Sequence, residues 1–558
     1  MTKRLKTLNT AYRFSVMILV ILALSVVSIA QAQNHYCYSP KGVVAAAVEG
    51  SSEAGVFILE NGGNAADAAV ATILALSIVD YEHFCFGGEA PLMIFDAGKN
   101  ETVVYSGMGT APLDPNAIEW YYQYGIPIND IKAAAVPCVL DLCVQVLIHH
   151  GTMKFTEIVQ PALKLLSISD QPWNKDLTNT FKKLIETEGR GNPGNREKGL
   201  MRVSKRFYKE DIAEELAQWY SKKGGFLTSK DLANYSTRVE KPIRINYKGY
   251  DILKCDTWTQ GAFLLETLNI LKKFDLKSMG FGTPEYIHTI TEAMKLSLAD
   301  RDKYFGDPLF VDVPLDFLLS EDYANSRREL IDKKKAVNVP RPGSLPENGS
   351  KKEETKFEQW PGGTTTCVVA DQYGNLVVAT PSGWGSNAGP GGITGIIHGT
   401  RLISFNTKEG HPNCIHPGKR PRITLTPTIV LKNDLPYLGI SVEGGDVQDQ
   451  ATLQILLNII EFGMTPSEAI NAPRIATTLH EDSFNPTPDR KEAIDNTPRL
   501  LMNDEFDPRT IEILRNMGHK IEITPNAIGI PALILIDKDG VKYAATDQKT
   551  DHYVNKIE

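Results

Sequence analysis

Three consecutive threonines follow a Pro-Gly-Gly bend in the segment QWPGGTTTCVVADQYGN, residues 359–375. A threonine hydroxyl can attack the carbonyl before it, and cleavage of Gly363–Thr364 would leave Thr364 with an α-amine. That amine has a reference pKa of about 8 and can serve as the base for the adjacent hydroxyl. Glycine at 363 permits backbone angles that a side chain would exclude. Taken alone, the segment is better interpreted as an ordinary turn followed by a threonine-rich strand.

Strand alternation places Thr366 on the same face as Thr364 and Thr365 on the opposite face. An acyl-transfer nucleophile also needs hydrogen-bond donors for the oxyanion that develops on the attacked carbonyl. The segment SVEGGDVQDQ offers candidates, because Gly444 and Gly445 follow an apolar strand and precede a helix, where backbone N–H groups lack helical partners. An ordinary strand-to-helix turn is the simpler interpretation of those glycines.

The elements that must position these residues alternate between strands and helices. Near the N-terminus we expect a short strand, a helix over 53–60, a Gly-Gly-Asn turn, an Ala-rich helix from Ala65 and a hairpin around Gly98. The middle third is predicted to be helical. A later helix at DQATLQILLNIIEFG precedes a closing strand pair at ALILIDKDGVKYAATD. Residues 333–363 are rich in Pro, Gly, Ser and charge, which predicts an exposed, mobile segment. This order predicts a layered α/β sandwich.

Composition narrows the class of protein. The chain has 558 residues with a net charge of −8, which gives no reason to expect nucleic acid or an anionic membrane as a partner. Its seven cysteines include no C-x-x-C pair, so we expect no disulfide framework, although a single bridge stays open. His411, Cys414 and His416 lack a second pair of ligands, and a surface loop is the better interpretation. No metal or other cofactor is predicted.

The N-terminus has the three parts of a secretory signal. Basic residues precede the apolar run FSVMILVILALSVVSIA, and small residues at Ala30 and Ala32 offer a cleavage site near Ala32–Gln33. An uncleaved membrane anchor is the alternative, because the run is close to spanning length. We expect residues 1–32 to be removed, leaving a periplasmic or secreted protein with no membrane contact.

Six stretches resemble the γ-glutamyltransferase (glutathione hydrolase) family of N-terminal nucleophile hydrolases, in family order and over nearly the whole chain after the signal. They are ENGGNAADAAVAT, GGFLTSKDLANY, TEAMKLSLADRDKYFGDP, TTTCVVADQYGNLVV, KRPRITLTPTIV and EAINAPR. The resemblance implies a four-layer αββα sandwich built from two subunits of one precursor, a large subunit 33–363 and a small catalytic subunit 364–558. It implies autocatalytic cleavage at Gly363–Thr364, Thr364 as nucleophile, and Gly444 and Gly445 as oxyanion glycines.

The resemblance is weakest where the family binds the amino-acid part of its substrate. Met108 stands where glutamyl-specific members have an arginine for the α-carboxylate. Where the family has a Thr-x-Thr-x-Asn pattern, this sequence has a hydroxyl at Ser382 but Trp384 in place of the asparagine amide. Where the family has a pair of serines, this sequence has a single hydroxyl, that of Thr424. With Thr366, these are the candidate substrate-binding residues, and the pocket that recognises a free amino acid is expected to be rebuilt.

We therefore expect an autoprocessing amidohydrolase or acyltransferase that forms an acyl-enzyme on Thr364 and accepts a small-molecule amide or γ-glutamyl substrate. One alternative is a true glutathione hydrolase or γ-glutamyl transferase with a rebuilt glutamyl pocket. In that case Arg401, Lys419 or Arg420 would reach the substrate carboxylate from another strand. The other alternative is an unprocessed, non-catalytic binding relative in which Thr364 is inert.

Overall fold

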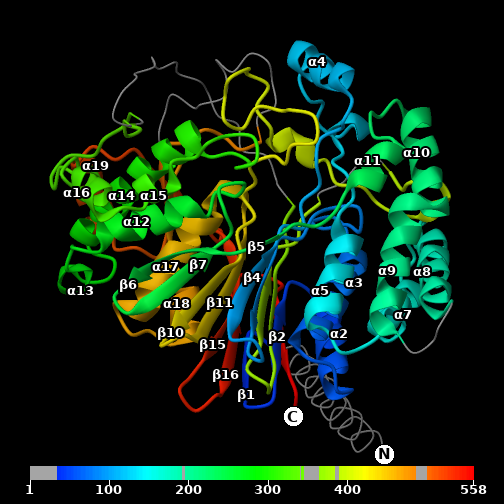
Figure 1. Ribbon diagram of the computed structural model, residues 1–558. Helices are drawn as coiled ribbons and strands as arrows, with labels where there is room; N and C mark the ends of the chain where they lie inside the picture. Colours follow the sequence, from blue (N-terminus) through cyan, green and yellow to red (C-terminus); the bar gives the residue numbers. More distant parts are fainter. Residues whose placement is uncertain (1–33, 191–194, 340, 345–362, 384–388, 485–498) are drawn as a thin grey trace, which may run out of the picture.

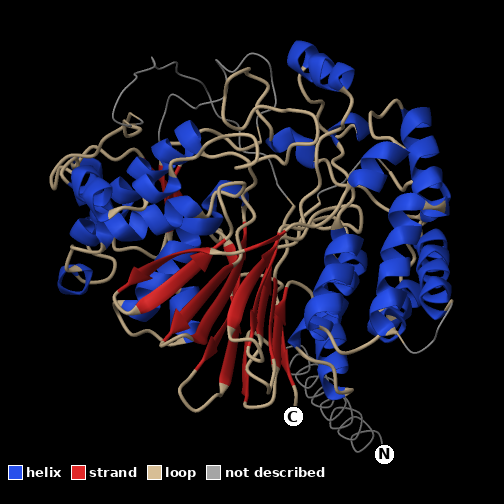
Figure 2. Ribbon diagram, viewed as in Figure 1, coloured by secondary structure: helices blue, strands red, loops and turns tan. Residues whose placement is uncertain are grey.

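Two seven-stranded sheets face each other at the centre of the molecule, and helices cover the outer face of each (Figures 1 and 2). The computed structural model describes residues 34–190, 195–339, 341–344, 363–383, 389–484 and 499–558. Strands β8 and β9 of one sheet contact β11 of the other. The expected αββα layering is confirmed.

The first sheet has the order β1-β16-β15-β11-β10-β7-β6, and all neighbouring strands are antiparallel. Its strands are β1 (Tyr36–Ser39), β6 (Ile243–Tyr247), β7 (Tyr250–Lys254), β10 (Thr428–Lys432), β11 (Leu435–Glu443), β15 (Ile530–Ile536) and β16 (Lys542–Thr546). A small third sheet beside it contains β12 (Ile475–Thr477), β13 (Leu500–Asn503) and β14 (Ile521–Thr524).

The second sheet has the order β17-β2-β8-β9-β3-β4-β5 and is also antiparallel throughout. Its strands are β2 (Val43–Ala46), β3 (Leu92–Asp96), β4 (Glu101–Tyr105), β5 (Val239–Glu240), β8 (Cys367–Ala370), β9 (Leu376–Ala379) and β17 (Tyr553–Lys556). Each of the two large sheets therefore interleaves strands from before and after Gly363.

Side chains of β8 alternate between two hydrophobic layers. Val368 and Ala370 lie in the layer between the two sheets, whereas Cys367 and Val369 lie in the layer under the helices. The helices of that outer layer are α2 (Glu49–Glu60), α3 (Ala65–Val79), α5 (Val139–His150), α6 (Phe155–Ile158), α7 (Gln160–Ile168), α8 (Asn174–Gly189), α9 (Arg196–Lys209), α10 (Asp211–Lys223) and α11 (Ser229–Asn234). Helix α4 (Pro115–Tyr124) lies apart from them (Figure 1), and its buried residues belong to the same hydrophobic cluster as Val368 and Ala370. Helix α3 packs on β8 and β9, because its many alanines allow close approach.

A second group of helices lies beside the first sheet. They are α12 (Ala262–Leu271), α13 (Leu276–Met279), α14 (Pro284–Tyr304), α15 (Leu315–Leu318), α16 (Glu321–Arg328), α17 (Gln448–Ile460), α18 (Pro466–Asn471) and α19 (Pro508–Asn516). Helix α17 packs on β11 and contacts α12. Both the early strand–helix–helix–hairpin order and the late helix with its closing strand pair agree with the sequence predictions.

The segment 333–363 differs from the sequence prediction in its first part. Residue 340 and residues 345–362 lie outside the described residues, but the described part is not simply exposed. Ala336 is buried, and its N–H donates to the carbonyl of Met517 at 2.7 Å. The N–H of Gly343 donates to the carboxylate of Asp300 on α14 at 2.6 Å. These contacts fasten the segment to two helices, and local composition carries no trace of such distant partners.

Two other predictions concern the environment of the chain. Among the residues that the structure describes, no helix combines the length and apolarity needed to cross a membrane. The predicted secretory signal, residues 1–32, lies outside the described residues. All seven cysteines are described and are free thiols, six of them buried, and Cys367 begins β8 as a buried residue.

Candidate active site

The second sheet extends past its regular strands to form the site around Thr364. Beyond β3, β9 and β8, Glu89 pairs with Ser382 and Ser382 pairs with Thr364, each in antiparallel fashion. The N–H of Thr365 donates to the carbonyl of Pro381 at 2.8 Å, which continues the ladder. Thr364 is only 4% exposed. The predicted nucleophile is thus held by backbone hydrogen bonds at the start of a central strand.

The peptide before Thr364 is held by side chains as well. The Ser382 hydroxyl donates to the carbonyl oxygen of Gly363, and the Arg401 guanidinium donates to that hydroxyl oxygen. Arg401 is itself bound to the buried carboxylate of Glu89. A Cβ atom at 363 would lie 2.7 Å from the Cα of His83, so the close approach of the backbone at this point requires glycine.

Gly444 and Gly445 lie in the turn between β11 and α17, as predicted. Their φ angles are +127° and +61°, a region that side chains other than glycine rarely occupy. A short 3₁₀ turn, η5 (Gly445–Val447), leads from them into α17. A Cβ at 445 would lie 3.2 Å from the ring of Phe484. The turn therefore places the backbone N–H groups of a helix start at the end of β11.

Buried polar side chains fix this turn, among them Arg301 of α14. The carboxylate of Asp446 accepts from Arg301 at 2.5 Å and from the Ser483 hydroxyl at 2.6 Å. Burial raises the pKa of Asp446, but Arg301, His480 and these hydrogen bonds outweigh it and lower the pKa to about 2. Gln260 accepts from Arg301 at 2.8 Å. The turn is thus held by an ionised carboxylate and a buried guanidinium.

Contacts across the two sheets bring the threonines and the glycine turn into one site. The alternation along β8 continues to Thr366, whose hydroxyl lies 3.2 Å from Nδ1 of His552. Nε2 of His552 lies 3.4 Å from the carboxylate of Glu443, the residue before Gly444. The sequence analysis missed His552, because it lies in a short C-terminal strand region with no motif around it.

The remaining candidate residues occupy different surroundings. Met108 is buried in the apolar layer between the sheets, together with Leu402 and Phe405. Thr424 is buried, and its hydroxyl has no hydrogen-bond partner among the described residues. Trp384 lies outside the described residues. The roles of these residues in substrate binding stay predictions.

The three cations considered as alternative carboxylate ligands have separate partners. Lys419 donates to the carbonyl of Pro412 at 2.7 Å, and Arg420 pairs with Asp307 at 3.2 Å and lies over the Trp258 ring. Of these three, Arg401 is the one bound to a residue that touches the Gly363 carbonyl, and its charge is matched by Glu89. The charge of Arg401 is therefore already paired before a substrate carboxylate is present.

Comparison with known proteins identifies the family. The model of the gamma-glutamyltranspeptidase family matches residues 51–168 and 169–557, and the chain belongs to that family. It is 30% identical to the glutathione hydrolase proenzyme of Escherichia coli (strain K12), over 92% of each chain. It is 28% identical to the acylase ACY 1 proenzyme of Pseudomonas sp. (strain SE83), over 90% of this chain and 91% of that one.

Solved structures give the same result. The cephalosporin acylase from Bacillus halodurans superimposes with a TM-score of 0.77 at 26% identity, over 94% of this chain and 98% of that one. The fold is thus that of the N-terminal nucleophile hydrolases of this family, and the protein is an enzyme of that class.

Proposed function

We propose that the protein cleaves itself at Gly363–Thr364 and then acts as an N-terminal-threonine amidohydrolase or acyltransferase. The observation that carries the proposal is the hydrogen bond from the Ser382 hydroxyl to the carbonyl of Gly363. A donor at that carbonyl polarises the peptide in front of Thr364 and would stabilise the oxyanion formed when it is attacked.

In the cleavage step, the hydroxyl oxygen of Thr364 bonds to the carbonyl carbon of Gly363, and the bond from that carbon to the Thr364 nitrogen breaks. The nitrogen takes up the proton and becomes an amine, while the two residues stay joined by an ester. Water then hydrolyses the ester, leaving a carboxylate on Gly363 and both a hydroxyl and an α-amine on Thr364. The products are a large fragment ending at Gly363 and a small one beginning at Thr364.

In the turnover step, the α-amine of Thr364 serves as base for its hydroxyl, which attacks the substrate amide and forms an ester with its acyl group. The N–H groups of the Gly444-Gly445 turn would receive the oxyanion. The amine part of the substrate leaves with a proton. Water or an acceptor amine then takes the acyl group and restores the hydroxyl.

For specificity we propose an acyl group that needs no charged clamp for an α-carboxylate. An unpaired carboxylate is costly to bury, and Arg401, which contacts Ser382 beside the scissile peptide, is already paired with Glu89. Met108 is surrounded by apolar side chains. The names of the acylase relatives support this choice, while those of the glutathione hydrolase relatives support a γ-glutamyl substrate.

We also propose that the protein is exported to the periplasm or the medium after removal of residues 1–32. Sequencing of the N-terminus of the mature protein tests this proposal.

A denaturing gel of the purified protein tests the cleavage. Wild type should give two fragments, with the smaller one starting at Thr364 by N-terminal sequencing, and Thr364→Ala should stay a single chain. Thr365→Ala is a matched control, because Thr365 lies on the other strand face, and it should be processed. A wild-type preparation that is active as one intact polypeptide would disprove the proposal.

A further inference from the structure

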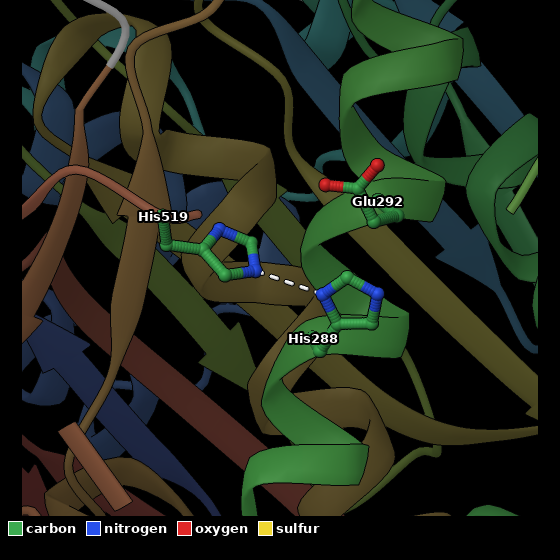
Figure 3. Close-up of side chains that lie close together, drawn as sticks. All are labelled: His288, Glu292 and His519. Atoms are coloured by element: carbon green, nitrogen blue, oxygen red, sulfur yellow. Dashed lines mark hydrogen bonds between the residues drawn. The ribbon is translucent and has the colours of Figure 1, made fainter. Parts of the chain in front are cut away.

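Three buried side chains outside the active site come together from distant parts of the chain. His288 and Glu292 lie one turn apart on α14, and His519 lies between α19 and β14. Figure 3 shows the two imidazole rings facing each other, with the carboxylate beside them. One ligand atom from each residue lies within 4.8 Å of the other two. Two imidazoles and a carboxylate are a common ligand set for Zn²⁺.

Hydrogen bonds around His288 determine which of its nitrogens carries a proton. Nε2 lies 2.7 Å from the carbonyl oxygen of Asp332, which can only accept, so Nε2 carries the hydrogen. In the neutral ring Nδ1 then presents a lone pair, and it lies 2.8 Å from Nε2 of His519. Histidines that bind metals are commonly oriented by a carbonyl or carboxylate on the other ring nitrogen. Nε2 of His519 therefore donates its hydrogen to Nδ1 of His288, and a metal ion bound between the two nitrogens would replace that hydrogen, with the hydrogen of His519 moved to its own Nδ1.

Glu292 supplies an anionic ligand next to the histidine pair. Its carboxylate accepts from Nζ of Lys295 at 2.8 Å and from the N–H of Val337 at 3.2 Å. Lys295 also donates to the carbonyl of Val337 at 2.8 Å, so it keeps a partner if the carboxylate turns away. Lys295 and a bound cation would therefore compete for the same carboxylate.

We propose that His288, Glu292 and His519 form a binding site for a divalent transition-metal ion, with Zn²⁺ as the best-suited ion. Nitrogen ligands favour Zn²⁺ over Mg²⁺ or Ca²⁺, which prefer oxygen, and a water would complete four-coordination. The ion would link α14, which precedes Gly363 in the chain, to His519, which follows Gly363. Binding to the folded state alone would stabilise the fold.

The test uses the full purified chain after treatment with a chelator and desalting. Wild type incubated with Zn²⁺ and desalted again should retain about one ion per chain, and its unfolding temperature should rise. Co²⁺ in place of Zn²⁺ should give the intense visible absorption of a tetrahedral site, a readout that needs no variant.

Two variants and a control assign the ion to these residues. His519→Gln should lose both the retained Zn²⁺ and the rise in unfolding temperature. His149→Gln, which changes an exposed histidine at the end of α5, should keep both. Lys295→Gln should bind Zn²⁺ more tightly than wild type, because the competing ammonium is gone. Circular dichroism checks that each variant is folded.

The proposal is overturned if wild type retains no Zn²⁺ and its Co²⁺ spectrum is the weak one of the hydrated ion. It is also overturned if folded His519→Gln retains as much Zn²⁺ as His149→Gln. Either result would leave the cluster as a hydrogen-bonded link between α14 and the chain around residue 519. Thr364-dependent activity does not enter this test, so the proposed function stands or falls separately.

Discussion

Ser382 donates its hydroxyl hydrogen to the carbonyl oxygen of Gly363 and pairs through its backbone with Thr364. One residue therefore aligns the nucleophile's strand and contacts the peptide that the nucleophile would attack. The same hydroxyl oxygen accepts from Arg401. A shift of Thr364 relative to Ser382 would therefore also change the hydrogen bond that polarises the Gly363 carbonyl.

Removal of that hydroxyl should slow self-cleavage. Ser382→Ala should reduce the rate of conversion to two fragments by about 100-fold, the usual cost of losing one donor to an oxyanion. The rate is followed on denaturing gels after synthesis of the precursor. Ser404→Ala is the control, because the Ser404 hydroxyl also accepts from Arg401, at 3.4 Å, but makes no hydrogen bond to Gly363 within the part of the chain that the structure describes. Equal processing rates in Ser382→Ala and wild type would contradict the assignment.

The glycine turn should be essential for turnover. Gly445→Val places a branched side chain at a φ of +61° and against Phe484, which would displace the backbone donors. Turnover by processed protein should fall by about 100-fold. Gly463→Val tests the backbone strain alone, because Gly463 has a φ of +67° with no atom within 4 Å of an added Cβ. Similar turnover in the two variants would refute the oxyanion role.

Stability should depend on the ionisation of Asp446 in acid. Its pKa of about 2 in the folded protein lies below the ordinary aspartate value, chiefly because Arg301 outweighs the effect of burial. The carboxylate thus contributes stability that is fully present above about pH 4 and is lost as pH falls toward 2, by about 2 kcal/mol in total. The difference in unfolding free energy between wild type and Asp446→Asn should shrink over that range in urea titrations. A difference that is independent of pH would disprove the coupling.

Substrate preference should separate the two enzyme hypotheses. If no clamp for an α-carboxylate is present, anilides that lack this group should have kcat/KM values at least equal to that of a γ-glutamyl anilide. Met108→Arg should then raise kcat/KM for the γ-glutamyl compound selectively, because a guanidinium can bind the carboxylate in a bidentate manner. Steady-state kinetics on the matched anilides measures these kcat/KM values and decides between the two hypotheses. A clear preference of wild type for the γ-glutamyl compound would show that the clamp lies elsewhere in the chain.

Local patterns in the sequence pointed to the main parts of the candidate site, whose catalytic roles stay predictions. Glycine and threonine at a strand start, and a glycine pair between a strand and a helix, are short-range signals, and the structure brings both together. The layered fold followed from periodicity and from the family resemblance. Partners that are far apart in sequence gave no such signal. Arg401 meets Glu89, and Thr366 meets His552, only because segments far apart in the sequence lie close together in the second sheet and its extension.

The segment before Gly363 is a second case in which local sequence could not predict contacts with distant residues. Its Pro, Gly and charged residues indicate a chain without regular structure, which holds for the described part. Composition could not show that Val337 would lie against Glu292 or Gly343 against Asp300. Irregular backbone can be fixed as firmly as a helix when its N–H groups find buried acceptors.

The interleaving of strands in both sheets has a consequence for the folding of the mature enzyme. Each sheet contains strands from either side of Gly363, so a cut there would leave two polypeptides that share both large sheets. Unfolding of the precursor is a first-order event, and one chain can refold at any dilution. After the cut, refolding requires an encounter of two chains and becomes second order in concentration. Self-cleavage would thus make the active enzyme dependent on having folded once as a single molecule, with its persistence set by the rate of unfolding.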